Sequence, residues 1–238
     1  MIKRQTIAVL VGLAGSLCAH ADEQATRPWK LTLGNYHYSD GSDGRDTNLR
    51  WRRDDTSVWV GAYHDPAFGS QVRTGFDTSI SLGGTAQLQP SLQAASRGFF
   101  GGSLNLQVGD PWFAVVGWGR TNLRPYFNLN FDPNDAITLG VGWHGDGGRS
   151  LMLSVIADDR LHTGQKDWHL SGRWPVRDDW RLTLDLMRKT GMGDEAEVRA
   201  WGWSATIDFP AWFIRVARDP NQNFSAVDAT RVAAGLRF

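Results

Sequence analysis

The sequence predicts an all-β protein, a single antiparallel β-barrel of about fourteen strands that crosses a membrane with its strands. Three observations predict this fold class. The chain starts with an export signal, nearly every later window alternates apolar and polar residues, and tryptophans gather beside tight turns. A barrel of twelve strands would also fit, because about 18 residues per strand and turn is ordinary for small barrels.

Residues 1–21 are expected to be a cleaved signal peptide. Lys3 and Arg4 give it a positive start, Ile7–Leu17 is an apolar stretch too short for a stable membrane anchor, and Ala19-His20-Ala21 is a small-x-small cleavage site. Residues 22–238 then form one domain. The single cysteine, Cys18, lies in the signal, so the mature domain has no disulfide and no thiolate metal site.

The composition fits strands with one lipid face and one wet face. The chain has 27 Gly and 12 Trp, and yet its mean hydropathy is negative. Without Lys3 and Arg4, 23 basic residues face 25 acidic ones, so no basic excess indicates a nucleic-acid partner.

Alternation with period two marks the individual strands. Gln71–Leu82 and Thr85–Gln93 are predicted to form a hairpin through Gly83-Gly84. Further strands are expected at Ser103–Val108, Tyr126–Asp132 and Arg181–Lys189. Fifteen candidate strands result, whereas both ends of such a barrel should lie on one side, which needs an even number. One long strand from Trp112 to Asp132, kinked near Pro125, would give fourteen.

Turn lengths predict an orientation. Tight turns flanked by tryptophan are expected in the periplasm, and the longer polar connections outside the cell. These longer connections are Ser39–Asp46, Asp159–Gln165, Thr190–Glu197 and Asp219–Ser225. Aromatic residues at the headgroup level form a girdle in membrane barrels. The residues expected in this girdle are Trp51, Trp59, Trp112, Trp174, Trp180, Trp212 and Phe238.

The last ten residues, Ala229–Phe238, read ATRVAAGLRF, with Thr, Val, Ala, Leu and Phe on one face and Arg, Ala and Gly on the other. This segment resembles the closing strand of Gram-negative outer-membrane β-barrel proteins. The resemblance implies the bacterial outer membrane as location, outer-membrane lipid and lipopolysaccharide as surroundings, and recognition of the terminal Phe238 by the barrel-assembly machinery. The strand should close the barrel on Trp29–Tyr38.

The inward face is predicted to line a pore. The pore-lining residues are expected to be Arg50, Arg52, Arg73, Asp77, Arg173, Arg181, Asp185, Arg215, Arg231 and Arg237. The resulting hypothesis is a channel of the porin type for passive passage of a small solute, with arginines that favour anions. Alternatively, these arginines pair with the aspartates and hold the wall rigid. Small acidic-sugar porins are similar in size and arginine content, although no motif of theirs is present.

Two other function classes remain open. A lipid-modifying enzyme would need a nucleophile, a base and an orienting acid, for which Ser171, His169 and Asp158 are weak candidates, with Ser154 on the preceding strand. The third class is a structural barrel without a conduit. No cofactor and no metal are expected, since the acidic segment SDGSDGRD lacks the Glu that closes a calcium loop.

Overall fold

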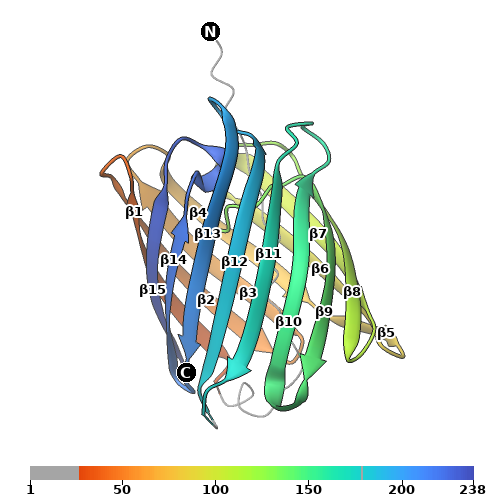
Figure 1. Cartoon of the computed structure of the whole chain (residues 1–238). Coiled ribbons are helices and arrows are strands. Elements are labelled where there is room, and N and C mark those ends of the chain that lie inside the picture. Colours follow the sequence, from red (N-terminus) through yellow and green to blue (C-terminus); the bar gives the residue numbers. More distant parts are fainter. Residues whose placement is uncertain (1–26, 178) are drawn as a thin grey trace.

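The computed structural model describes residues 27–177 and 179–238, which form one closed antiparallel β-barrel (Figure 1). The predicted signal peptide lies outside the described residues. The strands are β1 (Trp29–Tyr38), β2 (Asp43–Arg53), β3 (Thr56–Asp65), β4 (Gly69–Thr78), β5 (Ile80–Gly83), β6 (Ala86–Ala95), β7 (Phe99–Val108), β8 (Trp112–Thr121), β9 (Ala136–Gly145), β10 (Arg149–Asp158), β11 (Lys166–Pro175), β12 (Arg181–Met192), β13 (Glu197–Asp208), β14 (Trp212–Asp219) and β15 (Ala229–Arg237). Three single helical turns, η1 (Ser96–Gly98), η2 (Asp146–Gly148) and η3 (Gln222–Phe224), lie in the connections.

The fifteen strand segments make fourteen barrel strands, because β4 and β5 are one strand interrupted at Ser79 and both pair with β6. The predicted hairpin is confirmed: the turn lies at Gly84-Thr85, and Gly83 and Gly84 have φ values of 93° and 57°, which favour glycine. The count of fourteen is also confirmed. The predicted strand at Tyr126–Asp132 is wrong, however, because β8 ends at Thr121 and residues 122–135 form a connection before β9.

The barrel closes where the sequence predicted. β15 pairs with β1 from Tyr38↔Ala229 to Lys30↔Arg237, and Trp29 and Phe238 exchange two backbone hydrogen bonds of 3.0 Å. The chain end therefore belongs to the strand ladder. Trp29 and Phe238 therefore lie at the same rim, which we call the terminus end and which carries the C mark in Figure 1; the opposite rim is the loop end.

Connections differ at the two rims as turn lengths predicted. The hairpins at the terminus end are short, such as Asp54-Asp55 between β2 and β3. The four connections expected on the outside all lie at the loop end, together with residues 122–135. No helix in residues 27–177 and 179–238 is long and apolar enough to cross a membrane.

The two faces of the barrel are the reverse of those of a soluble β-sandwich. The outer face exposes large apolar side chains on nearly every strand, among them Leu33, Val60, Val72, Leu104, Val116, Leu139, Leu153, Leu170, Leu186, Trp203, Ile214 and Val232. Buried positions, in contrast, include many polar and charged side chains. Such an exterior is favourable only against lipid, and closure leaves no unpaired strand edge there.

Aromatic side chains surround the outer face at the terminus end. Six of the seven predicted girdle residues lie there, and Trp112 is 73% exposed. Phe209 stacks on Trp212 with ring centroids 3.8 Å apart, and it meets Trp180 edge to face at 4.6 Å. Trp59 is the exception, because it is 8% exposed and faces the lumen, where its indole covers Gly75. The prediction that Trp59 belongs to the girdle is therefore wrong.

Candidate functional site in the barrel lumen

The lumen is the only place where this fold gathers charged side chains from many strands, in the part of the chain that the structure describes. Alternation along each strand places all ten predicted pore-lining residues on the inward face. Their charges are arranged differently in the two halves of the lumen: cations predominate near the terminus end, and most charges form ion pairs near the loop end.

Cations dominate the half of the lumen near the terminus end. Seven lumen-facing cations lie within three residues of the strand ends at this rim, and we call them the basic wall: Lys30, Arg50, Arg52, Arg173, Arg181, Arg215 and Arg237. Among the described lumen-facing residues at the same level, the carboxylates are Asp77 and Asp208. Asp208 pairs with Arg237, and Asp77 lies 3.4 Å from Arg50. The wall thus keeps a large positive excess.

Three cations of this wall stand side by side. The register pairs Lys30 of β1 with Arg237 of β15 on one side and with Arg50 of β2 on the other. Nζ of Lys30 lies 4.3 Å from the centroid of the Phe213 ring, and it forms no ion pair with a described residue. Like charges directly opposite one another destabilise a sheet, so this row costs stability unless an anion neutralises it.

The facing wall near the same rim is neutral. Its inward side chains come from β6 and β7 and are Gln87, Gln89, Asn105 and Gln107. A solute at this level would therefore contact cations on one side and amides on the other.

Most charges in the half near the loop end are paired, although Arg231 bonds to the Tyr36 hydroxyl and the Leu129 carbonyl instead of a carboxylate. Arg73 contacts Asp46 at 2.6 Å, and both side chains are buried. The same arginine lies over the Trp59 ring at 5.6 Å. The sequence left open the alternative that arginines pair with aspartates. Such pairing is found in this half of the lumen, but it does not neutralise the basic wall.

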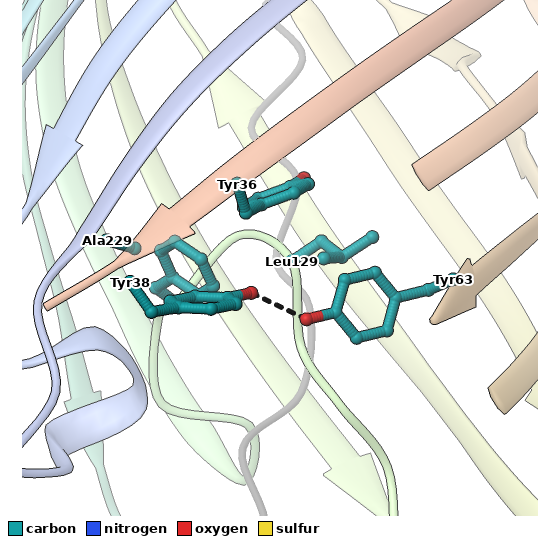
Figure 2. Close-up of a cluster of buried hydrophobic side chains, with 6 residues drawn as sticks. Tyr36, Tyr38, Tyr63, Leu129 and Ala229 are labelled. Atoms are coloured by element: carbon teal, nitrogen blue, oxygen red, sulfur yellow. Dashed lines mark hydrogen bonds between the residues drawn. The ribbon is translucent and has the colours of Figure 1, made fainter. Parts of the chain in front are cut away.

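The connection between β8 and β9, residues 122–135, folds inward and narrows the lumen near the loop end. Leu129 and Phe131 of this inward loop are 3% and 4% exposed and pack against Tyr36, Tyr38 and Tyr63 of the wall. Figure 2 shows Leu129 between the tyrosines of β1 and β3, with the Tyr38 and Tyr63 hydroxyls joined by a hydrogen bond of 2.5 Å. The apolar side chains that suggested a lipid-facing strand are buried inside the barrel.

Hydrogen bonds attach the inward loop to several strands of the wall. Gln71 of β4 exchanges two bonds with the backbone of Phe127, of 3.0 and 2.9 Å. Arg231 of β15 donates to the Leu129 carbonyl at 3.2 Å, and Asn223 donates to the Asn128 carbonyl. Backbone groups of a buried loop need such partners, so the loop has a defined position across the lumen.

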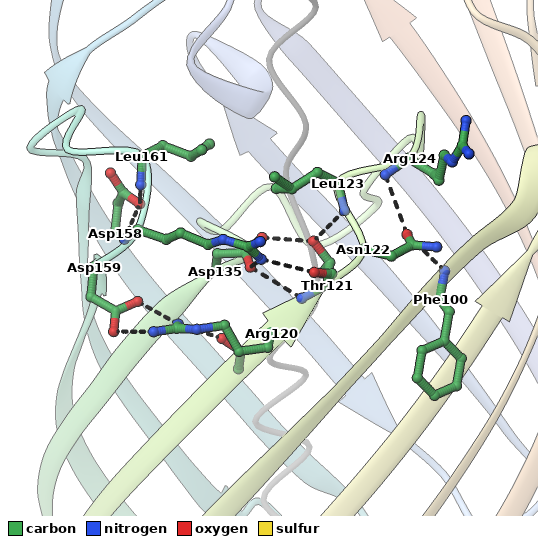
Figure 3. Close-up of polar contacts among 12 residues, drawn as sticks. Phe100, Arg120, Thr121, Asn122, Leu123, Arg124, Asp135, Asp158, Asp159 and Leu161 are labelled. Atoms are coloured by element: carbon green, nitrogen blue, oxygen red, sulfur yellow. Dashed lines mark hydrogen bonds and ion pairs between the residues drawn. The ribbon is translucent and has the colours of Figure 1, made fainter.

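The base of the inward loop is fixed by ion pairs (Figure 3). Asp135 accepts bonds from the Thr121 hydroxyl and backbone and from Arg160 at 2.7 Å. Arg120 forms a two-pronged pair with Asp159, with N–O distances of 2.5 and 2.6 Å. Bidentate pairs of this kind restrict geometry as well as adding energy.

The three candidate catalytic residues are not arranged for catalysis. Nε2 of His169 lies 3.0 Å from Asp132 of the inward loop, and Nδ1 lies 3.1 Å from Asp185 of β12. With a carboxylate at each nitrogen, the imidazole joins the loop to the wall and has no free nitrogen to act as base for Ser171. Asp158 instead accepts backbone bonds from Arg160, Leu161 and Thr163 in its own turn. The predicted grouping of His169, Ser171 and Asp158 is therefore wrong.

A second ionic group is buried beneath the inward loop. The ammonium of Lys189 on β12 lies 2.5 Å from Asp219 of β14, and Lys189 is 0% exposed. Asp167 stands opposite Lys189 in the register and is also fully buried. The rings of Phe131 and Phe224 lie 5.7 and 5.6 Å from the ammonium. This group holds three strands and the loop together.

Several lumen residues were missed from the sequence. Lys30 and Lys189 could have been found by alternation, since Lys30 shares a face with Tyr36 and Lys189 shares one with Arg181 and Asp185. Asp132 could not, because its segment alternates like a strand and nothing in the sequence indicates that it folds inward.

No protein-family model matches the chain, and no curated protein is similar to it in sequence. Among solved structures, the outer membrane protein Omp33 of Acinetobacter baumannii matches with a TM-score of 0.58 at 8% identity, over 89% of this chain and 98% of that one. The chain has the fold of an outer-membrane β-barrel protein.

Two porins also match in structure, at lower scores. The KdgM porin has a TM-score of 0.48 at 8% identity, over 88% of this chain and 99% of its own. The NanC porin has a TM-score of 0.47 at 10% identity, over 87% and 100%. The fold and the lipid-type exterior together place this barrel in the bacterial outer membrane.

Proposed function

We propose that the protein is a passive channel for small hydrophilic solutes and that it favours anions. The observation that carries this proposal is the basic wall, in which seven lumen-facing cations stand against two carboxylates. A wall that served only rigidity would pair its charges, as Arg73 and Lys189 do in the other half of the lumen.

The size of the barrel supports passage. Side chains can fill an eight-stranded barrel, and a barrel's diameter grows with the number of strands. This barrel has fourteen strands, and the inward loop bonds to the wall in the half near the loop end, at residues such as Gln71, His169 and Arg231. The half lined by the basic wall is the wider part of the proposed path.

The electrostatics of the lumen support the preference for anions. A cluster of cations on a low-dielectric wall raises the local concentration of anions several-fold or more. Arginine keeps its charge at every physiological pH and offers a planar fork to carboxylate and phosphate groups.

Liposome swelling tests the proposed passage. Liposomes that contain the refolded protein are expected to swell in small sugars and amino acids, faster than protein-free liposomes and more slowly as the solute grows. Heat-denatured protein is the control. Swelling no faster than in protein-free liposomes would remove the channel and leave a structural barrel.

A further inference from the structure

We infer that Arg237, Lys30 and Arg50 form a binding cradle for a multivalent oxyanion, that is, a solute that carries two or more phosphate or carboxylate charges. This inference rests on the proposed function, since the cradle lies on the path of the solute and would bind an anion during its passage.

The first step is the register. Arg237, Lys30 and Arg50 face one another directly across β15, β1 and β2. Side chains directly opposite in a sheet have Cβ atoms about 5 Å apart, so the three cations span about 10 Å along the wall. That span matches a solute with more than one anionic group better than a single monovalent ion.

The second step is the state of the central cation. Each outer arginine already has one carboxylate, Asp208 for Arg237 and Asp77 for Arg50. Lys30 has none among the described residues, although an ammonium has three donors. Its contact is with the Phe213 ring, which also lies 5.6 Å from the Arg237 guanidinium. A ring face orients an ammonium without cancelling its charge.

The third step is the surroundings of the row. Trp59 follows Arg50 in the register and limits the cradle on the side of β3. Arg215 of β14 lies two inward rows further towards the loop end, opposite Ala233. It adds a fourth cation to the same wall beyond the cradle.

Thermal unfolding of the detergent-refolded protein at low salt tests the cradle with pyrophosphate and citrate as probes and acetate as the monovalent control, at matched ionic strength. The unfolding midpoint of the wild type is expected to rise more with either multivalent probe than with acetate. Lys30→Gln is expected to weaken the apparent affinity for the probe about tenfold, the loss of one charge-assisted contact. Its midpoint without probe should equal or exceed that of the wild type, because the repulsion in the row is relieved.

Lys166→Gln, at an exposed position on the outer face of β11, is the matched control and should respond like the wild type. Arg50→Gln provides a second variant if Lys30→Gln fails to fold. A response to pyrophosphate alone, or to citrate alone, supports the cradle and identifies its chemistry. Equal responses to acetate and to both probes, or an undiminished response in Lys30→Gln and Arg50→Gln, would overturn it.

The channel and the cradle fail in different ways. A protein that is silent in liposomes but shows the anion-specific rise in midpoint would remove the channel and keep the cradle. A protein that passes solutes without such a rise would keep the channel and remove the cradle.

Discussion

Replacing residues 124–133 by two glycines is expected to raise the single-channel conductance several-fold. These residues are the part of the inward loop that crosses the lumen, and the replacement keeps Thr121 and Asp135, whose mutual bonds fix the base of the loop. The wall behind it is built from paired strands, so the barrel should still form. Planar-bilayer recording of the wild type and the variant measures the effect.

A single substitution tests the same role of the inward loop without removing the loop. Asp132→Asn removes one of the two carboxylates that hold His169, and it is expected to give noisier, more frequently interrupted currents. The control is Asp43→Asn, which removes an exposed pair with His37 at the rim and should leave the recording unchanged. An unchanged conductance after the loop replacement would show that the inward loop does not limit passage.

Lys189→Met is expected to lower the free energy of unfolding by about 3–5 kcal/mol, the cost of leaving a buried ion without its partner. The substitution removes the ammonium that pairs with Asp219 and stands opposite Asp167, and both carboxylates are buried. Urea unfolding of the barrel in lipid vesicles, followed by tryptophan fluorescence, measures the change.

Two further variants show whether the loss comes from unpaired charge. Combining Lys189→Met with Asp167→Asn and Asp219→Asn should recover most of the stability, since neutral side chains need no cation. Arg199→Ala, which removes an exposed pair with Glu197, should change the free energy by less than about 1 kcal/mol. If Lys189→Met alone unfolds like Arg199→Ala, the buried group does not hold the strands together.

Much of the fold could be predicted because the lipid environment imposes a simple pattern. Alternation assigned the inward and outward faces of the strands, as β15 shows from Ala229 to Arg237. It failed at Tyr126–Asp132, where Phe127, Leu129 and Phe131 alternate with polar residues and yet pack on the lumen wall. Alternation with period two identifies the residues that share a face, but it does not indicate whether that face contacts lipid or protein.

The candidate site was predictable only in part for a related reason. Trp59 was placed in the girdle because it lies near the Asp54-Asp55 turn, whereas its alternation with Val58 and Val60 shows that it points inward. The pairing of charges needed the register, since Lys30, Arg50 and Arg237 are far apart in the chain. Only the closed ladder brings them into one row.

The reversal potential of the open channel in a potassium chloride gradient tests the preference for anions most directly. The wild type is expected to show a reversal potential of the sign set by chloride, and Lys30→Gln/Arg50→Gln/Arg215→Gln is expected to shift it towards zero. The residual excess of cations in the variant explains why the shift should be partial. A wild-type reversal potential at zero, or of the sign set by potassium, would contradict the role assigned to the basic wall.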